Sequence, residues 1–260
     1  MTFEAQSKVN LTLEVLGERV DGYHALRSIV APISLADTIT LEKAQSATSD
    51  TGYDDDLCVK ALEALGVGGK VSVLKRIPAG GGLGGGSADA AAVLRTANEL
   101  YALGNSPEKL AEIGATFGSD IPALVLAQHY RRPVLMEGRG EVVSLMEPIA
   151  ERAMVLVNPG VHSSTPEVFR AWSLTRGLVV PSPDRWLVIG NDLQAAAIKL
   201  HPEIAEALAA LEAEGATECR MTGSGATSFG FASDPDEAER IAAALVKRGY
   251  QAWPATLCPK

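Results

Sequence analysis

Long apolar runs are absent from this chain of 260 residues, and cysteines are scarce. No run approaches the roughly 18 apolar residues that a membrane-spanning helix requires. The first eight residues also lack the basic and apolar segments of a signal peptide. Cys58, Cys219 and Cys258 are odd in number and have no metal-ligand spacing, so we expect them to be reduced and structural. These absences predict a cytoplasmic protein without a membrane partner.

Basic residues are outnumbered as well. Lys and Arg number 23 against 32 Asp and Glu, which gives a formal net charge of −9. This balance argues against a protein that coats duplex DNA or an anionic membrane surface, so we expect no nucleic-acid partner. Any anionic ligand must then be held by a local arrangement of groups. With 47% hydrophobic residues the chain is not disordered, and its length suggests two domains, residues 1–150 and 151–260.

Hydrophobic periodicity predicts both strands and helices. Apolar and polar residues alternate over residues 9–15, the period of a half-buried strand, and a second strand-like stretch, residues 29–41, is interrupted at Pro32 and Asp37. Ser106, followed by a proline and an acid, predicts the start of a helix that should end near Gly118. Further strands are expected at residues 71–74 and 154–157 and on either side of residues 222–225. Further helices are expected at residues 57–65, 90–103, 202–214 and 235–248 and from residue 165 onward.

One segment is unusually rich in glycine. Six of the seven residues from Gly80 to Gly86 are glycines, an entropic cost that an ordinary turn would not need. Close approach of a ligand to the backbone would explain them. Because the loop leads into a predicted helix, its amides and the positive end of the helix dipole favour phosphate oxygens. The loop therefore suggests nucleotide phosphates, although a tightly packed connection would use the same residues.

Other phosphate-binding and catalytic motifs fit this loop less well. A Walker A loop needs a lysine directly after its last glycine, but the next lysine is Lys109. A dinucleotide fingerprint matches in spacing, yet Pro78 interrupts the preceding strand and the expected acid at the end of a second strand is missing. The loop also resembles a hydrolase nucleophile elbow around Ser87, with His162 and His201 downstream, but Asp89 stands where its last glycine should be. The motif is therefore incomplete, and a serine hydrolase remains a poorly fitting alternative.

Five short motifs follow one another along the chain. They are Lys8-Val9-Asn10-Leu11, Arg19-Val20-Asp21-Gly22-Tyr23-His24, the loop from Pro78 to Asp89, Gly118-Ser119-Asp120-Ile121-Pro122 and Thr222-Gly223-Ser224-Gly225. Together they resemble the GHMP kinases over nearly the whole chain. The Asp-Gly-Tyr-His block narrows the resemblance to members that phosphorylate a cytidine diphosphate-linked methylerythritol on a route to isoprenoid precursors. The glycine loop alone would also suit homoserine, mevalonate or galactose kinases.

The resemblance implies an α+β fold of two domains. The N-terminal domain would be ribosomal-S5-like and hold the glycine-rich ATP-binding loop, and the C-terminal domain would be ferredoxin-like, with the active site in the cleft between them. The implied reaction is ATP-dependent phosphorylation of the 2-hydroxyl of the small-molecule substrate. ATP and Mg²⁺ are the implied cofactors, and the protein would be a monomer or a homodimer.

Two residues of these motifs resemble the family's catalytic pair. A tertiary alcohol is a weak nucleophile at neutral pH, and Asp120 would act as the general base that takes its proton. Lys8 would stabilise the developing alkoxide and orient Asp120. From the residues alone, Asp120 could equally be a loop carboxylate and Lys8 a solvated lysine at the end of a strand.

A second set of residues resembles the family's substrate site. Tyr23 would stack on the cytosine, His24 would hydrogen-bond its edge, and Phe169 would supply the second stacking face. Asn10, on the face of Lys8, and Thr165 would lie near the substrate. Phe169 can be interpreted equally well as an aromatic residue of the core. Asn10 can be interpreted as an asparagine at the edge of a strand. The loop at residues 222–225, in the second domain, would contribute Thr222, Gly223 and Ser224 to this site. From the residues alone it could be a simple hairpin turn.

A third set would hold the nucleotide. The glycine-rich loop would wrap the ATP phosphates, with Ser87 at the start of the following helix near the metal ion. Its members are Pro78, Gly80, Gly81, Gly82, Leu83, Gly84, Gly85, Gly86, Ser87 and Ala88.

The chain also departs from the family pattern. Asp56 stands where members typically carry Asn close to the nucleotide base, which puts adenine contacts there in doubt. Residues 128–136 replace an expected compact turn, either as a surface insertion or as a segment that reshapes the cleft. Two alternatives therefore remain: a small-alcohol kinase of the homoserine kinase type, and a nucleotide-binding regulator without catalytic activity.

Overall fold

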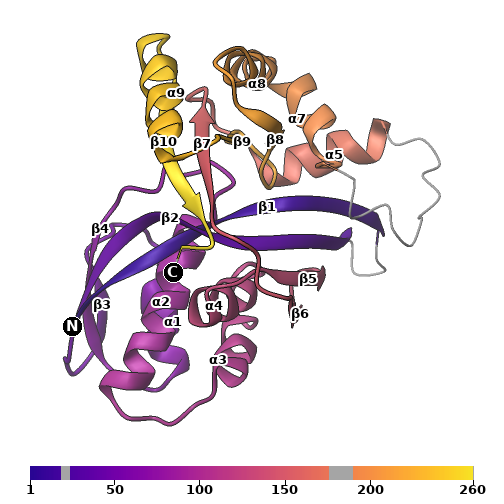
Figure 1. Cartoon of the computed structure of the whole chain (residues 1–260). Coiled ribbons are helices and arrows are strands. Elements are labelled where there is room, and N and C mark those ends of the chain that lie inside the picture. The colour runs from indigo at the N-terminus through magenta and orange to yellow at the C-terminus, as the bar shows by residue number, and fades with distance from the viewer. Residues whose placement is uncertain (19–23, 176–189, 260) are drawn as a thin grey trace.

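Two long antiparallel strands run across the molecule and separate two lobes (Figure 1). The computed structural model describes residues 1–18, 24–175 and 190–259. The two strands are β1 (Thr2–Glu18) and β2 (His24–Glu42), which pair along almost their whole length with three shifts of register. We call this pair the central ribbon. It belongs to both lobes, because Val9 is buried in one hydrophobic core and Leu13 and Val15 in another.

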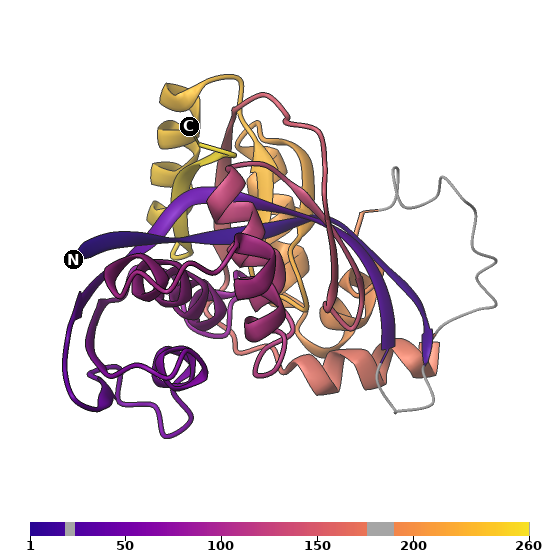
Figure 2. The ribbon, with the colours of Figure 1, turned by 90° about the horizontal axis from the view of Figure 1, so that it is seen from below.

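Within the described residues, four helices and four short strands of the N-terminal lobe surround the ribbon, and two of the helices contact it directly. β4 and β5 pair with different stretches of β2, β3 pairs with β4, and β6 pairs with β5. Figure 2, seen from below, shows these helices in front of the ribbon. The strands are β3 (Ala47–Ser49), β4 (Gly69–Leu74), β5 (Val134–Gly138) and β6 (Val142–Leu145), and the helices are α1 (Leu57–Ala64), α2 (Gly85–Leu100), α3 (Pro107–Gly114) and α4 (Ile121–Tyr130).

The C-terminal lobe contains a four-stranded antiparallel sheet. Its strand order is β10-β7-β9-β8, and helices intervene between β7 and β8 and between β9 and β10. This is the topology of a ferredoxin-like domain, so that prediction is confirmed. The strands are β7 (Arg152–Asn158), β8 (Thr217–Met221), β9 (Ser228–Phe231) and β10 (Gln251–Leu257), and the helices are α5 (Thr165–Thr175), α7 (Gln194–Leu200), α8 (Glu203–Ala213) and α9 (Pro235–Lys247).

The strand β7 is buried on both faces and joins the two lobes. Met154 and Leu156 belong to the core of the N-terminal lobe, whereas Val155 and Val157 pack in the core that α8 and α9 cover. Successive side chains of a strand point to opposite faces, so a continuous apolar run is what such a position requires. β10 lies beside β7 and reaches β2 through a single pairing, Leu257 with Ile33.

Most predicted elements are present, but three predictions were wrong in detail. The second predicted strand is not interrupted: β2 continues through Pro32, which lies at a shift of register, and through Asp37, whose side chain is buried in other contacts. The helix after Ser106 ends at Gly114 rather than near Gly118, and the helix after the glycine loop begins inside it, at Gly85.

Residues 128–136, expected to be a surface insertion or a segment that reshapes the cleft, have regular structure, and both alternatives stay predictions. They are the last turn of α4, a left-handed cap at Arg131 and the first residues of β5. Gln128 is buried, and its amide donates to the backbone oxygens of Gln6 and Ala88. The domain boundary at residue 150 falls between β6 and β7 and stays a prediction.

The three cysteines are free thiols, as expected. Burial is the main reason that the pKa values of Cys219 and Cys258 are raised to about 11, so neither is a reactive thiolate at neutral pH. None of the helices in the described ranges is long and apolar enough to cross a membrane.

Candidate active site

A cavity of about 1190 Å³ lies between the two lobes. Residues from all five sequence motifs line this cavity, although the motifs lie far apart in the chain. Of the residues singled out from the sequence, those that line it are Lys8, Asn10, His24, Pro78, Gly80, Gly81, Gly82, Gly84, Gly85, Gly86, Ser87, Asp120, Thr165, Phe169, Gly223 and Ser224.

Four singled-out residues do not line the cavity, and one cannot be placed. Leu83 and Ala88 turn their side chains into the core of the N-terminal lobe. Asp56 is the N-cap of α1, where it accepts hydrogen bonds from the Cys58 amide and the Thr51 hydroxyl. Tyr23 lies outside the described residues.

The fourth, Thr222, is fully buried behind the cavity wall. Its hydroxyl accepts a hydrogen bond of 2.8 Å from the backbone N–H of Asn10, which connects the second-lobe loop to β1. The loop is held from its other side by Asn191, whose amide donates to the backbone oxygens of Met221 and Gly223. These contacts give the loop a fixed position beside the ribbon.

The glycine loop needs its glycines for two physical reasons. Gly80, Gly82 and Gly84 have positive φ angles, which side chains disfavour. In addition, a Cβ at Gly82 would lie 2.5 Å from the backbone oxygen of Thr222, so the loop touches the second-lobe loop directly. Close approach at Gly82 is therefore to the protein's own backbone. Gly84, as the N-cap of α2, has no side chain to satisfy the first amides of the helix, which remain available to an anion.

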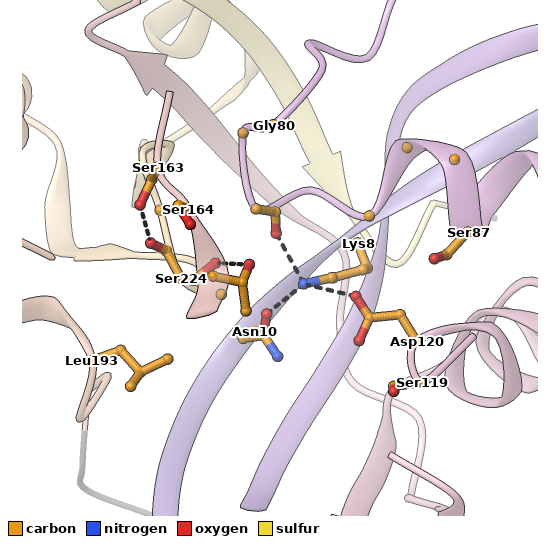
Figure 3. A pocket seen from close by; sticks show the side chains of 18 of the residues that line it. Lys8, Asn10, Gly80, Ser87, Ser119, Asp120, Ser163, Ser164, Leu193 and Ser224 are labelled. Carbon is orange, nitrogen blue, oxygen red and sulfur yellow. Dashed lines mark hydrogen bonds and ion pairs between the residues drawn. The ribbon is translucent and has the colours of Figure 1, made fainter. Parts of the chain in front are cut away.

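Lys8 and Asp120 meet at the centre of the cavity (Figure 3). The Lys8 Nζ is 3.8 Å from the Asp120 Oδ2, and it donates hydrogen bonds of 2.6 Å to the Asn10 Oδ1 and 2.9 Å to the Gly82 oxygen. Lys8 is 3% exposed, and burial lowers its pKa even though the Asp120 carboxylate acts in the opposite direction. A Cβ on Gly84 would lie 3.2 Å from the Lys8 side chain, so the start of α2 borders the pair.

Local structure explains why these side chains converge. Lys8 and Asn10 are two residues apart on β1 and therefore share one face of the strand. Asp120 immediately precedes α4, with Pro122 in the first turn of that helix. The carboxylate is about one-third exposed, so it can be reached from the cavity while the ammonium behind it is buried.

An aromatic cluster forms a second end of the cavity. The His24 ring stacks on Phe169 at a centroid distance of 4.9 Å and meets the edge of Trp172 at 5.6 Å. Its Nε2 is 2.9 Å from the Ser173 hydroxyl. The three partners lie on one face of α5, at helical spacings of three and four residues, and Figures 1 and 2 both place α5 beside the end of the ribbon where β2 begins.

Sequence reasoning missed a charged network beneath the glycine loop. The Lys75 Nζ donates to Asp37 at 2.5 Å and to Asp89 at 2.8 Å, and Asp37 also accepts the amides of Arg76 and Ile77. Desolvation is the main reason that the pKa of Asp89 is raised to about 7, although Lys75 acts against it. The network joins the entry of the loop to the first turns of α2. Asp37, an acid inside an apolar strand, was the available signal.

A metal ion bound to a nucleotide would find oxygen ligands here. The Ser87 hydroxyl, in the first turn of α2, and the Asp120 carboxylate both border the cavity. Mg²⁺ binds through one or two protein oxygens together with phosphate oxygens and water, so this donor set fits it. Among the described residues no group of three or more His, Cys, Asp or Glu forms a cage for a metal ion.

Comparison with known proteins gives a consistent result. Residues 56–128 match the family model for the GHMP kinases N terminal domain, and residues 183–251 match that for the GHMP kinases C terminal domain. The chain is 39% identical to the 4-diphosphocytidyl-2-C-methyl-D-erythritol kinase of Paracoccus denitrificans, over 96% of this chain and 93% of that protein. It is 38% identical to the enzyme of the same name from Moorella thermoacetica, over 94% of each chain.

Solved structures are similar along the whole chain. A crystal structure of 4-(cytidine 5'-diphospho)-2C-methyl-D-erythritol kinase superposes with a TM-score of 0.85 at 34% identity and covers 100% of both chains. The mevalonate kinase of Methanococcus jannaschii has a TM-score of 0.67 at 16% identity, covering 98% of this chain and 97% of that one, a similarity of fold alone.

Proposed function

Because the chain belongs to the GHMP kinase family and matches 4-diphosphocytidyl-2-C-methyl-D-erythritol kinases over nearly its full length, we infer that it catalyses their reaction. It phosphorylates 4-diphosphocytidyl-2-C-methyl-D-erythritol in the methylerythritol phosphate pathway to isoprenoid precursors. ATP is the phosphate donor, and the 2-hydroxyl of the methylerythritol is the acceptor. The meeting of Lys8 and Asp120 beside the glycine loop carries this proposal in the structure.

Catalysis would rest on positioning and charge, because phosphoryl transfer asks little covalent work of a protein. The oxygen of the 2-hydroxyl attacks the γ-phosphorus, the bond from that phosphorus to the β,γ-bridging oxygen breaks, and ADP leaves. The hydroxyl proton passes to Asp120. The Lys8 ammonium, anchored by Asn10 and the Gly82 oxygen, stabilises the charge that develops on the attacking oxygen and fixes the Asp120 carboxylate.

The nucleotide phosphates would lie against the glycine loop and the start of α2. Free amides there and the helix dipole favour the negative charge. Ser87 and Asp120 are the side chains that could contact Mg²⁺, which would neutralise the phosphate oxygens when bound. Asp56 is not proposed as a nucleotide contact, since its carboxylate caps α1.

The substrate would extend from this centre to the aromatic cluster. The methylerythritol would lie beside Asn10, near Gly223, and the cytosine would reach His24 and Phe169. Thr165 and Ser224, whose hydroxyls are 2.7 Å apart, border the path between the lobes. Tyr23 remains proposed as a stacking partner on the strength of the motif alone.

A coupled assay of ADP release with 4-diphosphocytidyl-2-C-methyl-D-erythritol tests the proposal. Asp120→Asn should lower kcat by about 10²–10⁴, the usual contribution of a general base, while binding of ATP and CMP persists. Asp236→Asn, at an exposed acid in the first turn of α9, is the matched control and should keep wild-type kcat.

Two results would count against the proposal. Unchanged kcat in Asp120→Asn would remove this residue from the mechanism. Turnover of homoserine without inhibition by CMP, and none of the cytidyl substrate, would place the chain among other small-alcohol kinases.

A further inference from the structure

The two ends of the substrate site are separated, and the proposed substrate carries its negative charge between them. Its alcohol would lie at Lys8 and Asp120, and its base at His24. A diphosphate joins the two parts. The protein therefore needs a positive group in the middle of this path, because a diphosphate removed from water is costly to leave uncompensated.

The two lysines of the cavity lie at other parts of it. Lys8 is bound to Asp120 and to two other oxygens at the acceptor end. Lys75 lies on the side of the glycine loop and is held between Asp37 and Asp89. Among the described residues, the arginines that line the cavity are Arg139 and Arg170.

Register and packing place Arg139 between the two ends. It follows β5, whose last residue, Gly138, pairs with Leu26, two residues along β2 from His24. On its other side Gly140 packs on the residue before Asp120, because a Cβ at Gly140 would lie 2.3 Å from the Ser119 oxygen. Arg139 thus connects the neighbourhood of the cytosine with that of the acceptor hydroxyl.

The turn that carries Arg139 is conformationally restricted. Gly138 and Gly140 have φ angles of +72° and +121°, and the Glu141 carboxylate accepts the Arg139 backbone amide. A defined turn lowers the entropy lost when its side chain binds a ligand. Arg139 itself is exposed and lines the cavity, and a guanidinium can bind phosphate oxygens in a bidentate manner.

We propose that Arg139 binds the diphosphate of the cytidyl substrate and so sets the spacing between base and acceptor hydroxyl. The proposal rests on the proposed function for the identity of the ligand. Arg170 follows Phe169 on α5 at the aromatic end, and it lacks the link to Ser119 that places Arg139 midway.

Calorimetric titrations of cytidine, CMP and CDP test the proposal. In Arg139→Gln the affinity for CDP should fall by roughly 10- to 100-fold, as expected for lost charge-assisted hydrogen bonds, whereas cytidine should bind as before. KM for the cytidyl substrate should rise with little change in KM for ATP, and Arg139→Lys should restore part of the loss. Arg248→Gln, at a surface arginine paired with Glu214 outside the cavity, is the charge-matched control.

The outcomes separate this proposal from the proposed function. Equal losses for cytidine and CDP, or no loss for CDP, would overturn the role of Arg139 even in an active enzyme. A loss of the CDP preference in Arg170→Gln, with none in Arg139→Gln, would overturn it as well. A wild-type protein without turnover would refute the proposed function, while a CDP preference that depends on Arg139 would still support the phosphate contact.

Discussion

The contact between Gly82 and the second-lobe loop makes a sharp prediction for Gly82→Ala. Gly82 has a φ of +75°, and a Cβ there would lie 2.5 Å from the Thr222 oxygen and 2.9 Å from the Gly225 oxygen. Both neighbours are backbone atoms of a loop fixed by Asn191. The methyl group therefore cannot be accommodated by rotating a side chain, and one of the two loops must move.

The structure gives the size of the effect. An ordinary contact begins at 3.4 Å, so the Thr222 oxygen and the glycine loop must separate by 0.9 Å. A left-handed alanine costs about 1–2 kcal/mol by itself. Misplacement of reacting groups by about 1 Å can cost about 100-fold in rate, and the Gly82 oxygen also anchors Lys8. We therefore expect kcat to fall by roughly 10- to 100-fold and stability by about 2–4 kcal/mol, from strain together with the displaced loop.

Gly104→Ala separates strain from the clash. Gly104 has a φ of +72° and nothing within 4 Å of the position of a Cβ. This variant should lose about 1–2 kcal/mol of stability by urea unfolding and keep its kcat. If Gly82→Ala retained a kcat within about twofold of Gly104→Ala, the claim that backbone contact between the loops positions the site would be refuted.

Two further predictions concern buried polar groups. Because desolvation is the main reason that the pKa of Asp89 is raised to about 7, its contribution to stability is full at acidic pH and is lost as pH rises towards 7. Between pH 5 and pH 8 the free energy of unfolding of Asp89→Asn should therefore increase relative to that of the wild type by on the order of 1–3 kcal/mol, as measured by urea unfolding. Parallel pH profiles of the two proteins would contradict this prediction. Asn191→Ala should cost about 1–3 kcal/mol, because the Met221 and Gly223 oxygens lose their donor, and a melting temperature equal to that of the wild type would show that the amide does not hold the loop.

Much of the fold could be predicted from local signals, and the exceptions have identifiable causes. Ser106 caps α3 as its sequence indicates, with its hydroxyl accepting the Lys109 amide. β10 was not predicted, since Pro254 stands in its middle. At that position the strand pairs only with β7, because β2 is reached only at Leu257, so a missing amide is tolerated there.

The candidate site was predictable only where residue type and resemblance agreed. The convergence of Lys8 and Asp120 follows from recognising the motifs, not from spacing, since 111 positions separate them in the sequence. Asp56 shows the opposite: its carboxylate caps α1, and the helix expected from residue 57 already indicated this role, whereas the family pattern directed attention to the nucleotide. Arg139 was not singled out, because only the pairing of β5 with β2 brings it near the cavity.

The central ribbon ties together two segments that the family models recognise separately. Its residue Val9 supports the hydrophobic interior of one lobe and Leu13 that of the other, while Met154 and Leu156, from beyond residue 150, complete the first. Severing the chain near residue 150 would leave each fragment with an exposed apolar surface that only the other can cover. We therefore expect the chain to unfold as one cooperative unit rather than as two independent halves.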